Sequence, residues 1–304
     1  MRWTLMIHGG AGQMTRDTLA QSQDTGARAA LNAALDAGSL VLARGGDALD
    51  AVEAAVRLLE DDPHFNAGRG AVLGFDGQVS LDAAIMNGAT QMAGAVAGVS
   101  GARNPISLAR RVMTSPHVML SGEGADQFGR EQGLEQAPPG WFELPERRAQ
   151  LAEMKARPDG WFDADMKYGT VGAVACDQHG CVAAATSTGG VTGKRWGRIG
   201  DTPIIGAGTW ADGVCAVSAT GSGEYFIRAG VGHQIAARIA LGGETVAQAA
   251  TAALSKVGQL GGRGGVIVVA PDGTAGWHFT TPAMFRGRAA SSGTRHIGIY
   301  GDEG

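Results

Sequence analysis

The 304-residue chain contains little cysteine, few aromatic residues and little charge of either sign. Its three cysteines, Cys176, Cys181 and Cys215, are an odd number, which argues against a disulfide framework. Cys176 and Cys181 flank His179, but they lack the Cys-x-x-Cys spacing and the second ligand pair of a structural zinc site. We therefore interpret this pair as the ends of two strands joined by a tight turn.

The chain also lacks a basic block and a long apolar run. The net charge is −4 and the charged residues are spread along the sequence, so neither nucleic acid nor a membrane surface is an expected partner. No apolar run approaches the roughly 20 residues that span a bilayer. The first eight residues form too short an apolar segment for a secretory signal, which predicts a cytoplasmic location.

Glycine, in contrast, is abundant, with 50 residues. Glycine at this frequency indicates tight turns, close backbone packing and loops that line a ligand site. Apolar periodicity predicts helices and strands along the whole chain. Helices are expected at 24–43, 47–59, 105–114, 222–240 and 244–257. Strands are expected at 3–7, 70–75, 79–86, 92–99, 117–121, 170–176, 181–187, 213–219, 264–270, 274–280 and 285–300. Helix pairs in series with groups of strands favour stacked sheets covered by helices.

Residues 122–168 differ in composition, being rich in charge, Gln, Gly and Pro. This is typical of a long surface linker with one or two exposed helical turns. Directly after it come Gly169 and Thr170, at the start of an alternating apolar strand. A threonine hydroxyl is a weak nucleophile inside a chain, but it becomes a competent one if the preceding bond is cut, because the freed α-amine can act as its base.

Small polar residues also gather at other strand ends. A hairpin turn at 177–180 places Thr188 nearly opposite Thr170. Residues 220–224 lie where a strand meets a helix, whose free N–H groups can stabilise an oxyanion. In the glycine-rich loop between them, Arg198 and Asp201 could bind a carboxylate and an ammonium, although spacing alone favours a surface salt bridge.

These segments together resemble the plant-type asparaginases, also called isoaspartyl peptidases, which are N-terminal nucleophile hydrolases. The matching segments, in the family's order over nearly the whole chain, are 8–12, 65–68, 168–175, 185–190, 197–203 and 219–224. The resemblance implies an α+β fold, the four-layer αββα sandwich, made as a single-domain precursor of residues 1–304. It also implies cleavage between Gly169 and Thr170 into an α chain (1–169) and a β chain (170–304), and a homodimer of such αβ units.

The resemblance further implies the catalytic roles. Thr170 would be the nucleophile, with its α-amine, of reference pKa about 7.7–8.0, as the base. Thr188 would orient the Thr170 hydroxyl, Thr220 and the Gly221 N–H would stabilise the oxyanion, and Asn66 would lie near the site. The reaction would pass through a covalent β-aspartyl ester of Thr170.

The substrates implied by the resemblance are L-asparagine and β-aspartyl dipeptides, which share one amino-acid head and release L-aspartate. Arg198 would bind the α-carboxylate of that head. Asp201 and the Gly223 carbonyl would bind its α-ammonium, beside Thr220 and Gly221. Because such a pocket holds only the head, different leaving groups can be accommodated.

No catalytic cofactor is implied, but the family has a structural Na⁺ held by main-chain oxygens, which suit a hard cation. In this chain the corresponding loop residues are Leu59, Glu60, Asp62, Phe65, Ala67 and Arg69. Arg69 stands where the family often has an aliphatic residue.

Two other hypotheses stay open. A glycosylasparaginase or a protein-cleaving threonine protease of the same superfamily would use the same nucleophile, and a substrate panel separates them. A non-catalytic or unprocessed relative would instead remain one intact chain.

Overall fold

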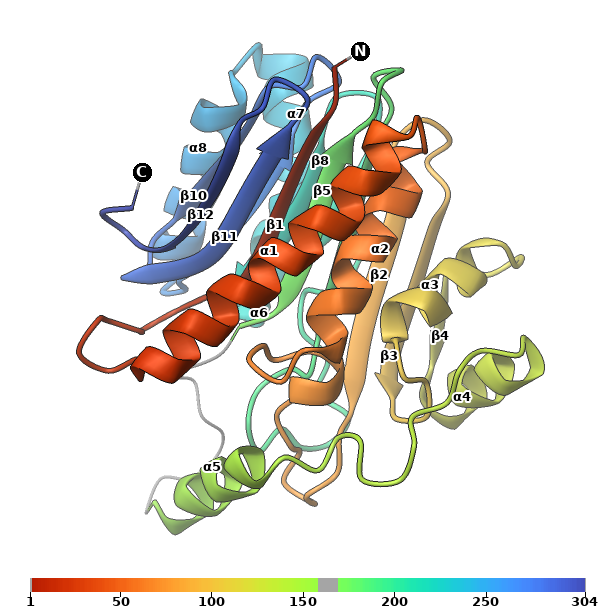
Figure 1. Ribbon diagram of the computed structural model, residues 1–304, viewed down its shortest axis with the longest axis vertical. Helices are drawn as coiled ribbons and strands as arrows, with labels where there is room; N and C mark the ends of the chain where they lie inside the picture. Colours follow the sequence, from red (N-terminus) through yellow and green to blue (C-terminus); the bar gives the residue numbers. More distant parts are fainter. Residues whose placement is uncertain (1, 158–168, 304) are drawn as a thin grey trace.

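The computed structural model describes residues 2–157 and 169–303, and within that part the strands form two sheets (Figure 1). The larger sheet has the strand order β12-β11-β1-β5-β6-β2-β3-β4, and the smaller one β10-β9-β8-β7. The strands of the larger sheet are β1 (Thr4–Gly12), β2 (Leu81–Asn87), β3 (Ala93–Val99), β4 (Met119–Ser121), β5 (Val171–Cys176), β6 (Val182–Thr188), β11 (Ala283–Ala290) and β12 (Arg295–Tyr300). The strands of the smaller sheet are β7 (Thr209–Ala211), β8 (Ala216–Gly221), β9 (Gly264–Val269) and β10 (Ala275–Phe279).

Helices cover the outer faces of these sheets. In Figure 1, α1 and α2 cross the larger sheet, and α2 packs on β5 and β6. Strands β8 and β9 contact β1 and β5 from the other side, and α7 and α8 pack on the smaller sheet. The helix bounds are α1 (Gln21–Ala43), α2 (Ala48–Asp61), α3 (Pro105–Met113), α4 (Gly122–Glu131), α5 (Pro145–Ala156), α6 (Gly223–Ala229), α7 (Val231–Gly242) and α8 (Val246–Gln259), with a short 3₁₀ helix, η1, at Gly68–Gly70.

The central strand β5 is buried along its whole length, and alternate residues serve two different cores. Val171, Ala173 and Ala175 belong to the cluster that includes α1 and α2, whereas Val174 and Cys176 face the smaller sheet. Because successive side chains of a strand point to opposite faces, both sets must be apolar. The mixed α/β architecture therefore brings the start of β5 close to the ends of strands from both sheets.

Most predicted elements are present, but the strand predicted at 70–75 is wrong. Its backbone groups bond within loops rather than to a neighbouring strand: Val72 N donates to the Asn66 side chain at 2.9 Å, and Gly74 N to Gln78 O at 2.8 Å. The predicted 222–240 helix is divided at Gly230, whose φ of +59° ends α6 before α7 begins.

Two other sequence-based predictions also need correction. The linker is more helical than predicted, since α4 and α5 are full helices, and Leu151 and Met154 of α5 pack against Leu73; residues 158–168 lie outside the described part. The predicted 285–300 strand is the hairpin β11–β12. Among the described residues, none of the helices has the length and hydropathy needed to cross a membrane.

Candidate active site

Thr170 lies immediately before β5, at the point where the two sheets meet. In the β5–β6 register Val171 pairs with Ser187, so Thr170 lies opposite Thr188. Cys176 pairs with Val182, so the connection has one residue more than the predicted turn at 177–180. The Thr170 hydroxyl donates to Thr188 Oγ1 at 3.0 Å, and Thr188 Oγ1 also accepts from Gly190 N at 3.0 Å. The Thr188 oxygen is therefore held from two directions and fixes where the Thr170 hydroxyl points.

The Gly169–Thr170 peptide is enclosed by main chain from two loops. Asn66 N donates to Gly169 O at 3.3 Å, while the Asn66 side chain binds Val72 N and Gly190 O at 2.9 and 2.7 Å. The Asn66 amide therefore organises the neighbouring loops, and its backbone N–H is the group that contacts Gly169. On the other side Gly10, at φ +106°, approaches so closely that a Cβ there would overlap the Gly169 backbone.

Thr220 and Gly221 bring the smaller sheet into the site at the end of β8. Thr220 is buried, and its hydroxyl accepts from Ala11 N at 3.4 Å. Gly221 has a φ of +154° and lies against the Arg263 carbonyl and the Phe226 ring. A small cavity of about 20 Å³, room for about one water molecule, lies among Thr170, Thr188, Thr220, Gly221, Arg198 and Asp201.

Arg198 is already paired with a carboxylate of the chain itself. Its Nε and Nη2 donate to Glu224 Oε1 and Oε2 at 2.9 and 3.0 Å, the forked geometry that a free carboxylate would also take. Although burial raises it, the hydrogen bonds and charge of Arg198 hold the pKa of Glu224 below its usual range. The expected carboxylate-binding group is therefore present at the site, with Glu224 as its partner.

Asp201, unlike Arg198, forms no ion pair with another described residue, and it is only 5% exposed. Within the described part of the chain its Oδ2 is buried without a hydrogen-bond partner, and Gly223 lies so close that a Cβ there would be 2.9 Å from Oδ1. Burial raises the pKa of Asp201 to about 7, despite the nearby charge of Arg198. Such a carboxylate would be stabilised by a cationic group entering the cavity.

This geometry agrees with what comparison with known proteins shows. The model of the asparaginase family matches residues 1–299. The isoaspartyl peptidase of Escherichia coli (strain K12) is 45% identical, over 99% of this chain and 97% of its own length. The chain belongs to the asparaginase family. The isoaspartyl peptidase/L-asparaginase of Homo sapiens is 41% identical over 98% of this chain and 96% of its own, and the plant-type L-asparaginase of Pyrococcus horikoshii is 42% identical over 92% and 94%. The prediction of a hydrolase of this family is thereby confirmed.

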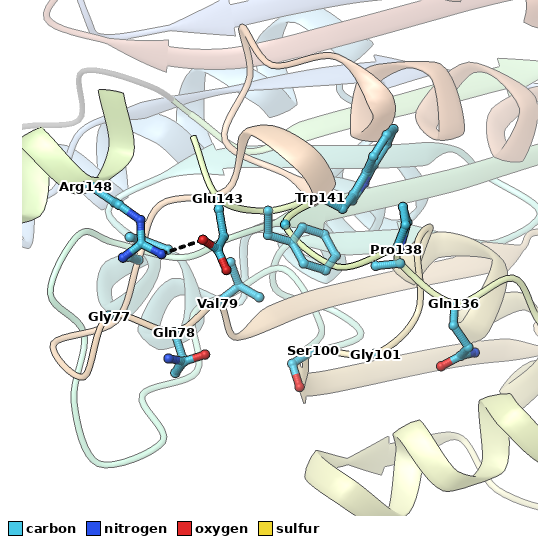
Figure 2. A pocket seen from close by; sticks show the side chains of 14 residues that line it. Gly77, Gln78, Val79, Ser100, Gly101, Gln136, Pro138, Trp141, Glu143 and Arg148 are labelled. Atoms are coloured by element: carbon cyan, nitrogen blue, oxygen red, sulfur yellow. Dashed lines mark hydrogen bonds and ion pairs between the residues drawn. The ribbon is translucent and has the colours of Figure 1, made fainter. Parts of the chain in front are cut away.

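Elsewhere in this asparaginase-family chain, a larger cavity of about 390 Å³ lies under residues 136–148 (Figure 2). Three of its polar side chains bond to the protein itself: Arg148 pairs with Glu143 at 2.7 Å, and Gln136 Nε2 donates to Leu134 O at 2.8 Å. Of the described residues that line it, none is a predicted site residue. We therefore place the chemistry at Thr170 and not here.

The loop predicted to bind Na⁺ runs from the end of α2 to η1. The last carbonyls of a helix, here including that of Glu60, lack intrahelical partners. Glycines fold the loop back over this carbonyl and over that of the loop residue Phe65, since Cβ atoms at Gly68 and Gly70 would overlap them. Among the described residues no group of three His, Cys, Asp or Glu side chains could hold a metal. The six predicted loop residues thus fit a cation only through main-chain oxygens.

Three polar residues at this site, Asp82, Lys194 and His8, had no role predicted from the sequence. Asp82, on β2, pairs with Thr188 in register and is fully buried, and Lys194 lies 3.8 Å from its Oδ2. His8 lies at the nucleophile itself, with Nδ1 3.0 Å from Thr170 O. A charged residue inside an otherwise apolar strand was the available signal for Asp82. His8 belongs to the 8–12 segment that resembles the family, but no local pattern predicts its role, since its partners lie more than 160 residues away.

Proposed function

We propose that this chain cuts itself between Gly169 and Thr170 and then hydrolyses the side-chain amide of L-asparagine and of β-aspartyl dipeptides. The observation that carries the proposal is the juxtaposition of the Thr170 hydroxyl, oriented by Thr188, with the buried, unpartnered Asp201 carboxylate in one cavity. The first is a candidate nucleophile and the second a candidate site for a substrate ammonium. The relatives' names describe the same two substrate classes.

The self-cleavage step would use groups already in contact. Thr170 Oγ1 attacks the Gly169 carbonyl carbon, the Gly169–Thr170 C–N bond breaks, and the hydroxyl proton passes to the new α-amine. The negative charge that forms on Gly169 O is stabilised by Asn66 N–H, which already donates to that oxygen. Water then hydrolyses the Gly169–Thr170 ester, giving a Gly169 carboxylate and a free Thr170 amine and hydroxyl.

Hydrolysis of substrate would repeat this chemistry on another carbonyl. The Thr170 amine takes the hydroxyl proton, Oγ1 attacks the side-chain carbonyl, and the proton goes to the leaving ammonia or peptide amine. Thr220 and Gly221 N–H would stabilise the oxyanion from the smaller sheet. Water then breaks the β-aspartyl ester of Thr170 and releases L-aspartate.

Binding of the substrate head would need an exchange of partners at Arg198. The α-carboxylate replaces Glu224 in the fork of the guanidinium, while Asp201 and the Gly223 carbonyl bind the α-ammonium. Gly223 lies against both groups, since a Cβ there would be 2.9 Å from Asp201 Oδ1 and 3.1 Å from Arg198 Nη2. A ligand without the ammonium would leave Asp201 uncompensated, and one without the carboxylate would leave Arg198 paired with Glu224, so the site would favour a zwitterionic head.

We extend the proposal to architecture and assembly. The two stacked sheets and their helices correspond to the αββα sandwich of N-terminal nucleophile hydrolases, split into chains 1–169 and 170–304, and two αβ units form a homodimer. Light scattering on the processed protein tests the dimer.

The main-chain oxygens of Leu59, Glu60, Asp62, Phe65, Ala67 and Arg69 would hold a structural Na⁺, which supplies local stability and no catalytic step.

Two variants of the nucleophile test the function. Thr170→Ala should remain one intact chain by mass spectrometry and lose hydrolysis by about a thousandfold or more. Thr170→Ser keeps a hydroxyl and an amine, so it should split and retain measurable turnover. Full activity of Thr170→Ala on a β-aspartyl dipeptide would refute the proposal. Turnover only of glycosylated asparagine, or only of protein substrates, would instead favour one of the other hydrolases.

A further inference from the structure

His8 is a fully buried residue of β1 whose imidazole bridges the two sheets. Its Nδ1 lies 3.0 Å from the main-chain oxygen of Thr170, and its Nε2 lies 2.9 Å from Ser218 Oγ on β8. Its cross-strand neighbour is Gly172, and a Cβ at that position would overlap both the imidazole and Ser218 Oγ. Glycine at 172 thus provides the space in which the histidine reaches the nucleophile residue.

The contact with Thr170 fixes the tautomer of His8. A carbonyl oxygen only accepts, so the hydrogen must lie on Nδ1, and Nε2 must accept from the Ser218 hydroxyl. Burial lowers the pKa of His8 to about 3, even though the Thr170 hydrogen bond opposes that shift. The ring is therefore neutral near pH 7, with a single defined orientation.

A chain of buried hydroxyls holds the far side of the ring. Ser218 Oγ lies 2.7 Å from Thr186 Oγ1, which lies 2.8 Å from Thr209 Oγ1, and Thr209 Oγ1 lies 3.0 Å from Thr202 O. These hydroxyl-bearing residues are all fully buried. This series of hydrogen bonds begins at Thr202, the residue after Asp201, and ends through His8 at the main chain of Thr170. It therefore connects the loop of Arg198 and Asp201 to the candidate nucleophile.

The charged residue closest in register points elsewhere. Arg286 pairs with His8 between β1 and β11, but its guanidinium donates to Met284 O and Tyr300 O at 3.1 and 3.2 Å. The contacts of His8 are therefore with neutral groups, and its effect on Thr170 is one of position rather than of charge.

Because the Thr170 Cα is tetrahedral, the contact between His8 and the Thr170 carbonyl affects where the Thr170 nitrogen lies. One substituent ends in the hydroxyl, which is anchored on Thr188, and another ends in the carbonyl, which is anchored on His8. With two substituents of a tetrahedral carbon fixed, the direction of the third, the nitrogen, is also fixed. We propose that His8 is a positioning residue that aims the freed Thr170 amine at its own hydroxyl. This inference rests on the proposed function, because only a cleaved chain has that amine.

Two isosteric replacements separate positioning from packing. In His8→Asn the amide nitrogen can occupy the place of Nδ1 and donate to Thr170 O, whereas in His8→Gln it reaches the place of Nε2 and Ser218. On fully processed protein, kcat for a β-aspartyl dipeptide should fall on the order of tenfold or more in His8→Gln, with KM within about twofold of wild type. His8→Asn should keep kcat within about threefold, by the same positional argument.

Ser218→Ala is the matched control, because it breaks the same buried chain but leaves the Thr170 contact in place. Its kcat should stay within about threefold of wild type. An equal loss in His8→Asn and His8→Gln, an equal loss in Ser218→Ala, or a KM that rises in parallel would each show that His8 only packs, and would overturn the proposal.

A measurement on the unmodified protein covers the case in which His8→Gln does not mature. The ¹⁵N shifts of the His8 ring should report a neutral Nδ1–H tautomer that does not titrate between about pH 5 and 8. An Nε2–H tautomer, or titration in that range, overturns the inference. Full activity of Thr170→Ala would remove the proposed function instead, whereas a normal kcat in His8→Gln beside an inactive Thr170→Ala would remove this inference alone.

Discussion

Arg198 and Glu224 form a two-point ion pair, Nε–Oε1 2.9 Å and Nη2–Oε2 3.0 Å, at the mouth of the site. The pair occupies the same fork that would bind the α-carboxylate of a substrate. On the proposed function, Glu224 would compete with the substrate for Arg198, and substrate binding would include the cost of displacing Glu224.

Glu224→Gln should strengthen substrate binding, because a neutral amide competes less well for the guanidinium than a carboxylate does. We expect the KM for a β-aspartyl dipeptide to fall by about threefold to tenfold, since this side chain is half exposed and its pair is partly screened. Steady-state kinetics measure the change. Glu244→Gln, which breaks the similar forked pair with Arg238, is the control and should leave KM unchanged. A KM that rises in Glu224→Gln would instead show that Glu224 orients Arg198 for substrate.

Asp201 should make both activity and stability depend on pH. Only the carboxylate binds an ammonium, so KM should rise as the pH falls below about 7, the pKa of Asp201 in the folded chain. Because folding raises this pKa, the folded state binds the proton more tightly than the unfolded state. Stability should therefore fall as the pH rises from about 4 to about 7, by about 4 kcal/mol in total.

Asp201→Asn tests that assignment, because it removes the cost of ionisation together with the charge. Compared with wild type it should be more stable by about 4 kcal/mol at pH 8 and by less than about 2 kcal/mol at pH 5, while losing hydrolysis. Urea unfolding at the two pH values gives the difference. An equal effect at both pH values would assign the stability change to some cause other than the titration of Asp201.

Gly10→Ala should disturb the cleavage site in a way that Gly45→Ala does not. Both glycines have positive φ, +106° and +82°, but a Cβ at Gly45 meets open space while one at Gly10 overlaps Gly169. The shared backbone strain costs about 1 kcal/mol, and the overlap should add about 1–3 kcal/mol at Gly10 alone. Intact mass followed over time should show self-cleavage slowed about tenfold or more in Gly10→Ala. Similar cleavage rates in the two variants would mean that the close approach does not position the scissile bond.

Sodium should stabilise the loop from 59 to 69. If Na⁺ is present at a hundred times its dissociation constant, the free energy of unfolding should rise by about 2.7 kcal/mol over choline at equal ionic strength. Thermal unfolding in the two salts measures this. Gly70→Ala, whose Cβ would overlap the Phe65 carbonyl, should abolish the difference. No difference in the parent chain would exclude the site.

The sequence pattern predicted those features that depend on residues close together in the chain, such as the β5–β6 hairpin. The predicted turn at 177–180 put Thr170 and Thr188 nearly opposite each other, and the actual connection is one residue longer, since Cys176 pairs with Val182. The 70–75 segment was apolar enough to suggest a strand, but its backbone partners lie in loops, and such partners leave no periodicity in the sequence. Helix α5 was missed because its few apolar positions pack on a distant loop.

Contacts between the two sheets could not be predicted in the same way. Ser218, one partner of His8, lies on β8 of the smaller sheet, which meets β1 only when the two sheets stack. Thr170, the other partner, precedes β5, which pairs with β1 in the larger sheet although the two strands are far apart in the sequence. Asp201 and Arg198 were expected to face a ligand, but burial of the first and pairing of the second with Glu224 depend on where α6 begins. The residue types therefore indicated the chemistry of the site. The protonation state of Asp201 and the pairing of Arg198 depend on contacts that form only in the folded protein.

The close enclosure of Gly169 by Asn66 and Gly10 also sets how the enzyme would be switched on. Gly169, whose carbonyl would be attacked, is joined to the nucleophile by a single peptide bond, so dilution cannot lower its local concentration and dialysis cannot remove it. Activity should then appear with first-order kinetics after folding, with the same half-time at every protein concentration. Each molecule would be cleaved independently of the others, so a cell could raise the amount of enzyme without raising the rate constant of its activation.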